Sequence, residues 1–178
     1  MLNIYITDLA AYNQGHLVGE WVALPMDKDE LAFKVKMILG KGEVLCNDSL
    51  HEEYFITDYE FDTVNVFSVG EYANIYNLNE KAQLLEDIAE SEHKVIKFLL
   101  DENIVSSLEE AIGKRGEVAV YENYTMQDIA VEYIEENFDL DSLSPLIANN
   151  LNYDGIAADL EVDGCYFKVD SDIFYYCG

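Results

Sequence analysis

Basic residues are scarce in this chain of 178 residues. It has 10 Lys plus Arg against 36 Asp plus Glu, which gives a formal net charge of −26. Proteins that bind DNA or RNA neutralise phosphates with lysine and arginine, so nucleic acid is disfavoured as a direct ligand. Hydrophobic residues make up 50% of the chain, whereas disordered acidic tails lack the apolar residues to build a core. The composition therefore predicts a folded, strongly acidic protein.

Long apolar runs are missing as well. No stretch approaches the roughly 18 apolar residues of a membrane span, and the N-terminus lacks the basic region of a signal peptide. We therefore expect a cytoplasmic protein without membrane contact. The three cysteines, Cys46, Cys165 and Cys177, are widely spaced and form no CxxC pair. Because a disulfide framework needs an even, dense set, we predict free thiols.

Motifs for catalysis and metal binding are also absent. His16, His51 and His93 show no HExxH spacing, and we interpret His51 as part of a solvated loop or strand start. Gly40-Lys41-Gly42 lacks the first glycine and the Ser/Thr of a phosphate loop. Among 36 acidic residues chance carboxylate pairs are inevitable, so no pair stands out. The sequence predicts a protein that is not an enzyme and holds no cofactor. A weak calcium site and an unrecognised carboxylate site stay open as alternatives.

The first 61 residues predict a ββαβ unit with a small antiparallel sheet. Three segments rich in β-branched and aromatic residues predict strands, at 2–7, 16–24 and 53–60. Asp27 and Glu30 form a capping box for a helix, and Gly40 stands where that helix is expected to end.

Residues 62–113 predict a helical middle domain, and residues 114–178 an acidic α+β domain. The candidate N-caps of the middle domain are Asn79, Ser91 and Ser107. The last domain is expected to contain a strand at 117–122, a helix from Thr125 to Asn137, a helix from Ser144-Pro145 onward, and a hairpin of 162–169 with 172–176. The predicted fold class is α+β: an elongated chain of small domains, with sheet-plus-helix units on either side of a helical middle.

The segment 125–141 is the most informative one. Its apolar residues recur at helical spacing and should face a core; they are Met126, Ile129, Ala130, Tyr133 and Ile134. Its acidic residues fall on the opposite face; they are Asp128, Glu132, Glu135, Glu136 and Asp139. Such neighbours lie about 5–6 Å apart on a helix, which is compatible with the spacing of phosphates along a DNA strand of about 3.4 Å rise each.

A row of carboxylates on a rigid helix can therefore present a DNA-binding groove with negative charges in place of DNA phosphates. The alternative is an ordinary solvated face. Ordinary solvated helices carry Glu–Lys pairs that offset repulsion, and this helix has none. One-sign charge destabilises a compact state, which favours a role in binding. Further acids of the same domain complete the candidate phosphate-mimic set: Asp141, Asp154, Asp159 and Glu161.

Two segments resemble the ArdA antirestriction family. The first runs from Tyr12 to Trp21 and is similar to the family's YNxGxxxGxW signature, with Tyr12, Asn13, Gly15, Gly19 and Trp21 in place. The second, 152–167, is similar to the family's DYExxARDL…xGDY pattern and differs from it at Gly155 and Ala158. With the chain's length, acidity and element order, the resemblance covers essentially the whole chain.

The resemblance implies a non-catalytic DNA mimic that pairs into a curved homodimer. Its implied partner is a type I restriction–modification enzyme, whose DNA-binding groove it would occupy. The main alternative is an acidic inhibitor or adaptor of another basic DNA-binding protein. The first motif suits packing better than charge recognition, with Gly15 in a turn, Gly19 at a close strand approach and Trp21 in the core. Because aromatic residues are enriched at interfaces, the dimer seam is predicted at Tyr153, Tyr166 and Phe167.

Overall fold

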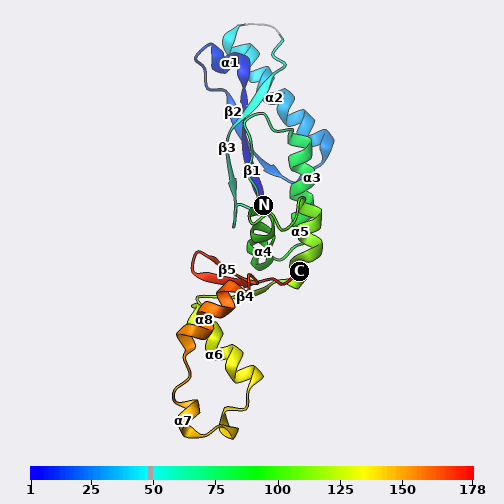
Figure 1. Cartoon of the computed structure of the whole chain (residues 1–178). Helices are drawn as coiled ribbons and strands as arrows, with labels where there is room; N and C mark the ends of the chain where they lie inside the picture. Colours follow the sequence, from blue (N-terminus) through cyan, green and yellow to red (C-terminus); the bar gives the residue numbers. More distant parts are fainter. Residues whose placement is uncertain (48–49) are drawn as a thin grey trace. The chain divides into compact units, whose positions relative to one another are not determined.

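The computed structural model describes residues 1–47 and 50–178, and the chain divides into two compact units, Met1–Ile112 and Gly113–Gly178. Each unit contains a three-stranded antiparallel sheet together with helices (Figure 1). This composition confirms the predicted α+β class. A further division of the first unit at residue 61 stays a prediction.

The sheet of the first unit has the order β2-β1-β3. Its strands are β1 (Leu2–Asp8), β2 (Gly19–Leu24) and β3 (Tyr54–Phe61). The central strand pairs Ile4 with Val22 on one side and with Tyr59 on the other. Because side chains alternate along a strand, β1 sends Leu2, Ile4 and Ile6 into the core, where each is almost completely buried.

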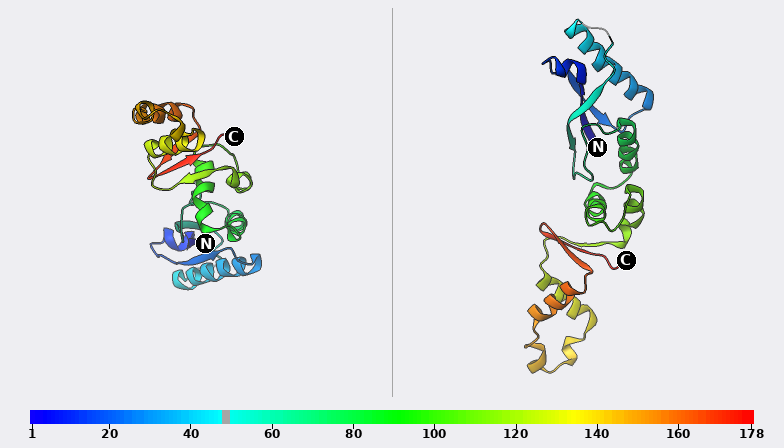
Figure 2. Two further views of the ribbon diagram at one scale, coloured as in Figure 1. Left: turned by 90° about the horizontal axis from the view of Figure 1, so that it is seen from below. Right: turned by 45° about the horizontal axis from the view of Figure 1, so that its top comes forward.

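Helix α2 (Lys28–Cys46) packs on this sheet through Leu31, Val35 and Ile38 (Figure 2). The Asp27 carboxylate caps it by accepting from the backbone N–H groups of Asp29 and Glu30. The expected end at Gly40 is wrong, since the helix continues to Asn47, which adopts the left-handed conformation at φ 51°. An internal glycine costs a helix about 1 kcal/mol, and the buried apolar face of α2 outweighs that cost.

A buried pair of side chains, Asp8 and His51, joins the end of β1 to the segment before β3. Asp8 caps the short helix α1 (Leu9–Asn13), which the sequence did not reveal, by accepting from Ala11 N at 3.0 Å. Its second oxygen lies 2.6 Å from His51 Nδ1, and both side chains are buried. Residues 51–53 form a loop directly before β3, as expected, and Glu52 and Glu53 are exposed, but His51 is buried rather than solvated. Glu52 and Glu53 made the segment look polar. The burial of His51 depends instead on Asp8, which is 43 residues away in the sequence.

Three helices complete the first unit: α3 (Ile75–Glu86), α4 (Glu90–Asp101) and α5 (Leu108–Lys114). Asn74, not Asn79, caps α3. Asn79 is buried inside α3, where its amide donates to Met26 O and accepts from Met26 N, both at 2.8 Å. The contact with Met26 thus determines that Asn79 acts as a buried hydrogen-bonding residue and not as a helix cap. Ser91 lies within α4 rather than before it.

The predicted cap of α5 is confirmed in part. Ser107 Oγ accepts from Glu110 N at 3.2 Å, and the Glu110 carboxylate reaches back to Ser106 N at 3.1 Å instead of Ser107 N. The helix passes through Gly113, its expected end, to Lys114 and continues as a 3-10 turn over Arg115–Glu117. Gly113 therefore is not the stop that the sequence suggested.

The second unit has a sheet of order β4-β6-β5 and the helix pair α6/α8 packed together against it. Its elements are β4 (Ala119–Tyr121), α6 (Met126–Asn137), α7 (Pro145–Ala148), α8 (Tyr153–Val162), β5 (Tyr166–Val169) and β6 (Asp172–Tyr175). The core contains Met126, Ile129, Ala130, Leu160 and Ile173. The hairpin starts later than expected because α8, which the sequence did not reveal, extends to Val162, and a turn at 163–164 follows it.

The C-terminal hairpin also corrects the prediction for the cysteines. Cys165 and Cys177 form a disulfide, with their Cα atoms 5.0 Å apart. Strand pairing brings them together, since Tyr166 is opposite Tyr175 and Tyr176 N donates to Cys165 O at 2.8 Å. The spacing of the cysteines in the sequence does not indicate how β5 and β6 pair. Cys46 lies at the last residue of α2.

Candidate acidic interface

The N-terminus of α6 begins at Thr125, the predicted cap, and the structure adds a capping box with Asp128. Thr125 Oγ1 accepts from Asp128 N at 3.2 Å, while Asp128 Oδ2 accepts from Thr125 N at 2.8 Å and from Thr125 Oγ1 at 2.6 Å. Hydrogen bonds from the Thr125 hydroxyl, and then from its backbone N–H, lower the pKa of the Asp128 carboxyl. Asp128 is therefore a helix cap as well as a charge at this surface.

Removing the Thr125 hydroxyl should raise the pKa of Asp128 toward the ordinary value of about 3.9. A lowered carboxyl pKa gives stability that is present above the unfolded pKa and is lost as the pH falls through the folded pKa. NMR titration of the Asp128 carboxyl carbon in Thr125→Val, with Thr125→Ser as the control that keeps the hydroxyl, measures this shift. Equal titration curves for the two variants would show that the box does not hold the carboxylate in solution.

The two faces of α6 differ as predicted, with one exception. Met126, Ile129, Ala130 and Ile134 are buried. Tyr133 is 39% exposed, so its placement in the core is wrong. Tyr133 lies on the apolar side of α6 by its spacing, but its long ring with a polar tip extends to solvent.

The acidic row does not lie on one helix as the sequence suggested. Glu135 and Glu136 are exposed on α6, but the helix ends at Asn137 and its C-cap Phe138 is extended. Asp139 and Asp141 are exposed in the following segment, at a 3-10 turn over Leu140–Ser142. Residues 138–152, which contain this turn and the short helix α7, connect α6 to α8 and extend away from that helix pair (Figure 1). The carboxylates therefore follow a helix and then a loop.

Glu132 is the inward member of the row. It is half-buried, and among the described residues its Oε2 is buried without a hydrogen-bond partner. Burial raises the pKa of Tyr121, and the negative charges of Glu132 and Glu136 raise it further. Burial also raises the pKa of Tyr166, with smaller contributions from nearby tyrosines and Glu132. The Glu132 carboxylate thus lies near a group of tyrosines.

A shallow hollow with a volume of about 590 Å³ lies beside the outer face of α6. Its lining includes four carboxylates and one aromatic ring; the residues are Glu122, Asn123, Tyr124, Asp128, Val131, Glu132 and Glu135. Carboxylates can bind guanidinium groups in bidentate fashion, and a tyrosine face attracts cations. The sequence interpretation missed Glu122 and Tyr124, although an acid and an aromatic residue directly before the Thr125 cap are a usable signal.

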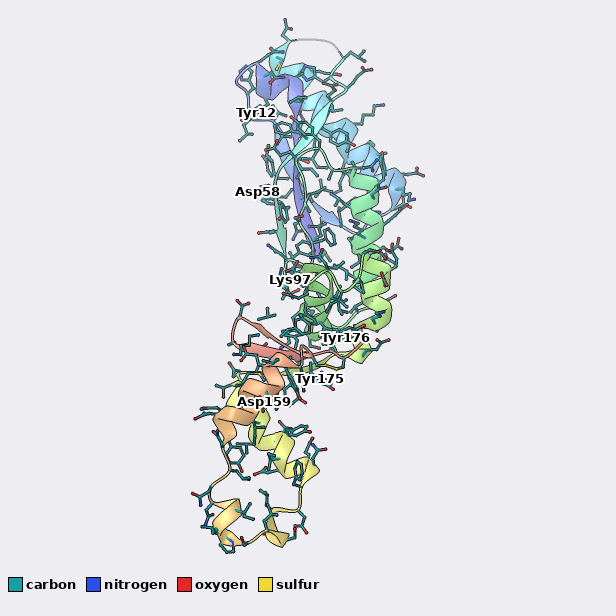
Figure 3. The ribbon with its side chains drawn as sticks, in the orientation of Figure 1. Tyr12, Asp58, Lys97, Asp159, Tyr175 and Tyr176 are labelled. Atoms are coloured by element: carbon teal, nitrogen blue, oxygen red, sulfur yellow. A yellow bond between two sulfur atoms is a disulfide. The ribbon has the colours of Figure 1, made fainter. Side chains whose placement is uncertain are left out.

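The acids of α8 have different surroundings. Asp154 accepts from the side-chain amide of Gln127, which links α8 to α6. Asp159 is exposed on α8 (Figure 3). Glu161 forms an ion pair with Lys168 at 2.9 Å, and Lys168 is the only base from residue 116 onward. Of these three predicted mimic residues, Glu161 therefore has the most compensated charge.

The residues predicted for the dimer seam contribute to the packing of their own unit. Tyr153 and Tyr166 pack against the core of the second unit, and the Tyr166 ring lies 4.8 Å from that of Tyr175. Phe167 is half-buried on β5. These aromatic side chains are only partly accessible, and their role between two copies stays a prediction.

The N-terminal motif occupies the first sheet and its neighbouring helix. Gly15 has φ +86°, which favours glycine, and a Cβ on Gly19 would lie 2.6 Å from Ile6 O. Trp21 is 46% exposed and packs edge-on against Tyr5, so it is not the expected core anchor. Tyr12 packs edge-on against Phe55, and Asn13 is the exposed last residue of α1. Gly15 is thus favoured by its backbone conformation and Gly19 by the close approach of β1.

Within residues 1–47 and 50–178, no group of three or more His, Cys, Asp or Glu side chains could hold a metal ion. No helix in the same ranges is long and apolar enough to cross a membrane.

Comparison with known proteins then identifies the family. A search of curated proteins gives no match. The model of the family described as antirestriction protein (ArdA) matches residues 4–175, which include both units and the whole candidate interface. The members of this family act as inhibitors rather than as enzymes. The chain therefore belongs to the ArdA family of antirestriction proteins.

Proposed function

We propose that the protein is a DNA mimic that occupies the DNA-binding groove of type I restriction–modification enzymes. The observation that supports this most strongly is the row of carboxylates along α6 and the segment after it. A hollow lies beside this row, and its four lining acids are Glu122 and three members of the row. The second unit carries few bases, and Lys168 is paired with Glu161. Such a surface presents a nearly uniform negative potential to a basic groove.

The mechanism we propose is competition for the groove. The exposed carboxylates would take the place of DNA phosphates, and arginine side chains of the enzyme would enter the hollow beside Tyr124. The protein would form no covalent intermediate and need no cofactor. We further propose that it works in the cytoplasm, where its target meets DNA, and that two copies pair as a homodimer.

A competition experiment tests this function. A type I enzyme is incubated with labelled DNA containing its recognition site, and the protein is added at increasing concentration. We expect displacement of the DNA that weakens steeply as NaCl rises, because exposed charges act over a Debye length of about 10 Å at 0.1 M salt. Simultaneous binding of DNA and protein at one groove, or binding that ignores salt, would refute the mimic.

The same competition assay distinguishes the proposed function from the main alternative, an acidic inhibitor of another basic DNA-binding protein. If the protein leaves type I enzymes unaffected but displaces DNA from another basic protein, such as a nucleoid protein or nuclease, it is an acidic inhibitor of that other class. Running both kinds of target under identical salt conditions distinguishes the two functions.

A further inference from the structure

A disulfide closes one end of the C-terminal hairpin. The strands β5 and β6 pair over four positions, and the turn between them contains Asp170 in the left-handed conformation at φ 53°. The disulfide lies at the other end, because Cys165 directly precedes β5 and Cys177 follows β6 by two residues. The hairpin, red in Figure 1, is thus held by a turn at one end and by a covalent bond at the other.

This hairpin positions the start of the candidate interface. Its strand β6 is the central strand of the sheet and pairs with β4 over three positions. The Asp172 carboxylate at the start of β6 accepts from Asn123 N at 3.1 Å. Glu122, Asn123 and Tyr124, which line the hollow beside α6, directly follow β4. A change in the hairpin therefore affects the position of these three lining residues.

The sheet is small, so one covalent bond contributes much of its stability. Strand β4 has three residues, and β5 and β6 have four each, whereas strands of globular proteins usually have about five or six. Cys165 and Cys177 are 12 residues apart. A disulfide that closes a loop of this length restricts the unfolded chain, which favours the closed hairpin by a factor on the order of 100.

The disulfide is accessible from solvent. Cys177 is exposed and Cys165 is half-buried, and thiol–disulfide exchange requires that a thiolate reach one of the two sulfur atoms. Disulfides are rare in cytoplasmic proteins, where those that occur are usually transient, catalytic or redox-sensing. The proposed function assigns the protein to that compartment. An exposed disulfide there is typical of a redox-sensing pair rather than of a permanent structural bond.

Contacts of the neighbouring Tyr176 keep the two cysteines close when the bond is broken. Tyr176 N donates to Cys165 O at 2.8 Å, and Lys114 Nζ donates to Tyr176 Oη at 3.1 Å. Lys114 Nζ also lies 5.8 Å from the centre of the Tyr176 ring. These contacts involve no sulfur atom, so they do not depend on the disulfide. The two thiols therefore stay near one another, which makes the reaction reversible.

We propose that Cys165–Cys177 is a thiol–disulfide exchange site whose reduction weakens the candidate interface. The reductant is a dithiol, such as a protein with a CxxC pair. Its thiolate attacks the exposed Cys177 sulfur, the protein disulfide breaks, and Cys165 leaves as a thiolate that takes up a proton. The second thiol of the reductant then loses its proton and displaces Cys177, which is protonated in turn. Two electrons pass to the protein, and the reductant becomes a disulfide.

This inference rests on the proposed function and adds redox control to it. Breaking the bond releases the end of β6, which weakens its pairing with β4 and leaves Glu122 and Tyr124 less firmly positioned. Exposed contacts of this kind contribute up to about fivefold each. We therefore expect the reduced protein to displace DNA from a type I enzyme about tenfold less effectively than the oxidised protein.

DNA competition with the oxidised chain and with the chain reduced by dithiothreitol tests the proposal. Hydrogen exchange, followed by mass spectrometry, is recorded on the same two samples. Peptides covering 119–124 and 172–176 should exchange up to about 100-fold faster after reduction, whereas peptides from β1 in the first unit should not change. Removal of dithiothreitol and addition of oxidised glutathione should restore both the competition and the slow exchange.

Two variants separate the disulfide from other effects of the reductant. The double variant Cys165→Ser/Cys177→Ser should behave like the reduced chain and should not respond to dithiothreitol. Cys46→Ser is the matched control, because Cys46 lies on α2 in the first unit. It keeps the disulfide and should respond to dithiothreitol like the original chain. If the double variant does not fold, the original chain in its two redox states still decides the question.

Several results would overturn this inference. They are alkylation of both cysteines in the chain treated with oxidised glutathione, equal competition by the oxidised and reduced chains, equal hydrogen exchange in the two states, and a response of the double variant to dithiothreitol. Absence of competition by both redox states would overturn the proposed function together with this inference. Equal competition by both states would overturn the inference alone.

Discussion

Replacing five exposed carboxylates of the second unit by amides should reduce inhibition of a type I enzyme about 100-fold, because exposed charges contribute up to about 1 kcal/mol each and act together. The five are Glu122, Glu135, Glu136, Asp139 and Asp141. Each single replacement should reduce inhibition about fivefold or less. Asp128 is left unchanged, since its carboxylate also caps α6. The measurement is the concentration of protein that halves DNA cleavage by the enzyme.

The control removes the same number of charges from the first unit. Glu52, Glu53, Glu60, Glu71 and Glu102 are exposed there and can be changed to glutamine together. We expect this variant to keep most of its inhibition. An equal loss in both variants would show that inhibition follows net charge alone. Loss of all inhibition through one Glu→Gln change, with the fold intact, would point to a specific site instead of a distributed surface.

The second large effect is expected at Gly42 of α2, with Gly40 of the same helix as the comparison. Gly42→Ala should lower the free energy of unfolding by about 1–3 kcal/mol, since the added methyl group overpacks the buried, hydrogen-bonded Asp8–His51 pair. A Cβ at Gly42 would overlap the Asp8 carboxylate and lie 2.9 Å from His51 Nδ1. Urea unfolding at one low protein concentration measures the change.

Gly40→Ala is the matched control for that substitution. Its methyl group would enter open space among the described residues, so the variant should gain up to about 1 kcal/mol from better helix propensity. The two alanine variants should therefore shift stability in opposite directions. If Gly42→Ala stabilised the protein as Gly40→Ala does, the Asp8–His51 pair would not pack against α2 in solution.

Local signals predicted the elements that local contacts determine. The helix from Thr125 to Asn137 was correct because its cap and its apolar spacing both lie within 13 residues. Ser144-Pro145 likewise starts α7. The end of α2 was wrong because the helix beyond Gly40 packs through Gly42 against Asp8 and His51, which are distant in the sequence. Asn79 was misplaced because its partner, Met26, is 53 residues away.

The candidate site was predicted only in part, because some of its residues depend on local spacing and others on contacts with residues far away in the sequence. Helical spacing identified the exposed carboxylates of α6, such as Glu135 and Glu136. It could not foresee that Glu132 turns inward near Tyr121 and Tyr166, because those tyrosines come from the sheet. The disulfide of Cys165 with Cys177 depends on strand register in the same way.

Carboxyl footprinting of the complex tests the central claim most directly. The chain is labelled with a carbodiimide and an amine, alone and bound to a type I enzyme, and the modification of each acid is measured by mass spectrometry. The DNA-mimic account predicts strong protection of Glu122, Glu135 and Glu136, with added DNA restoring their labelling as it displaces the protein. Protection confined to acids of the first unit, or protection that DNA does not reverse, would contradict it.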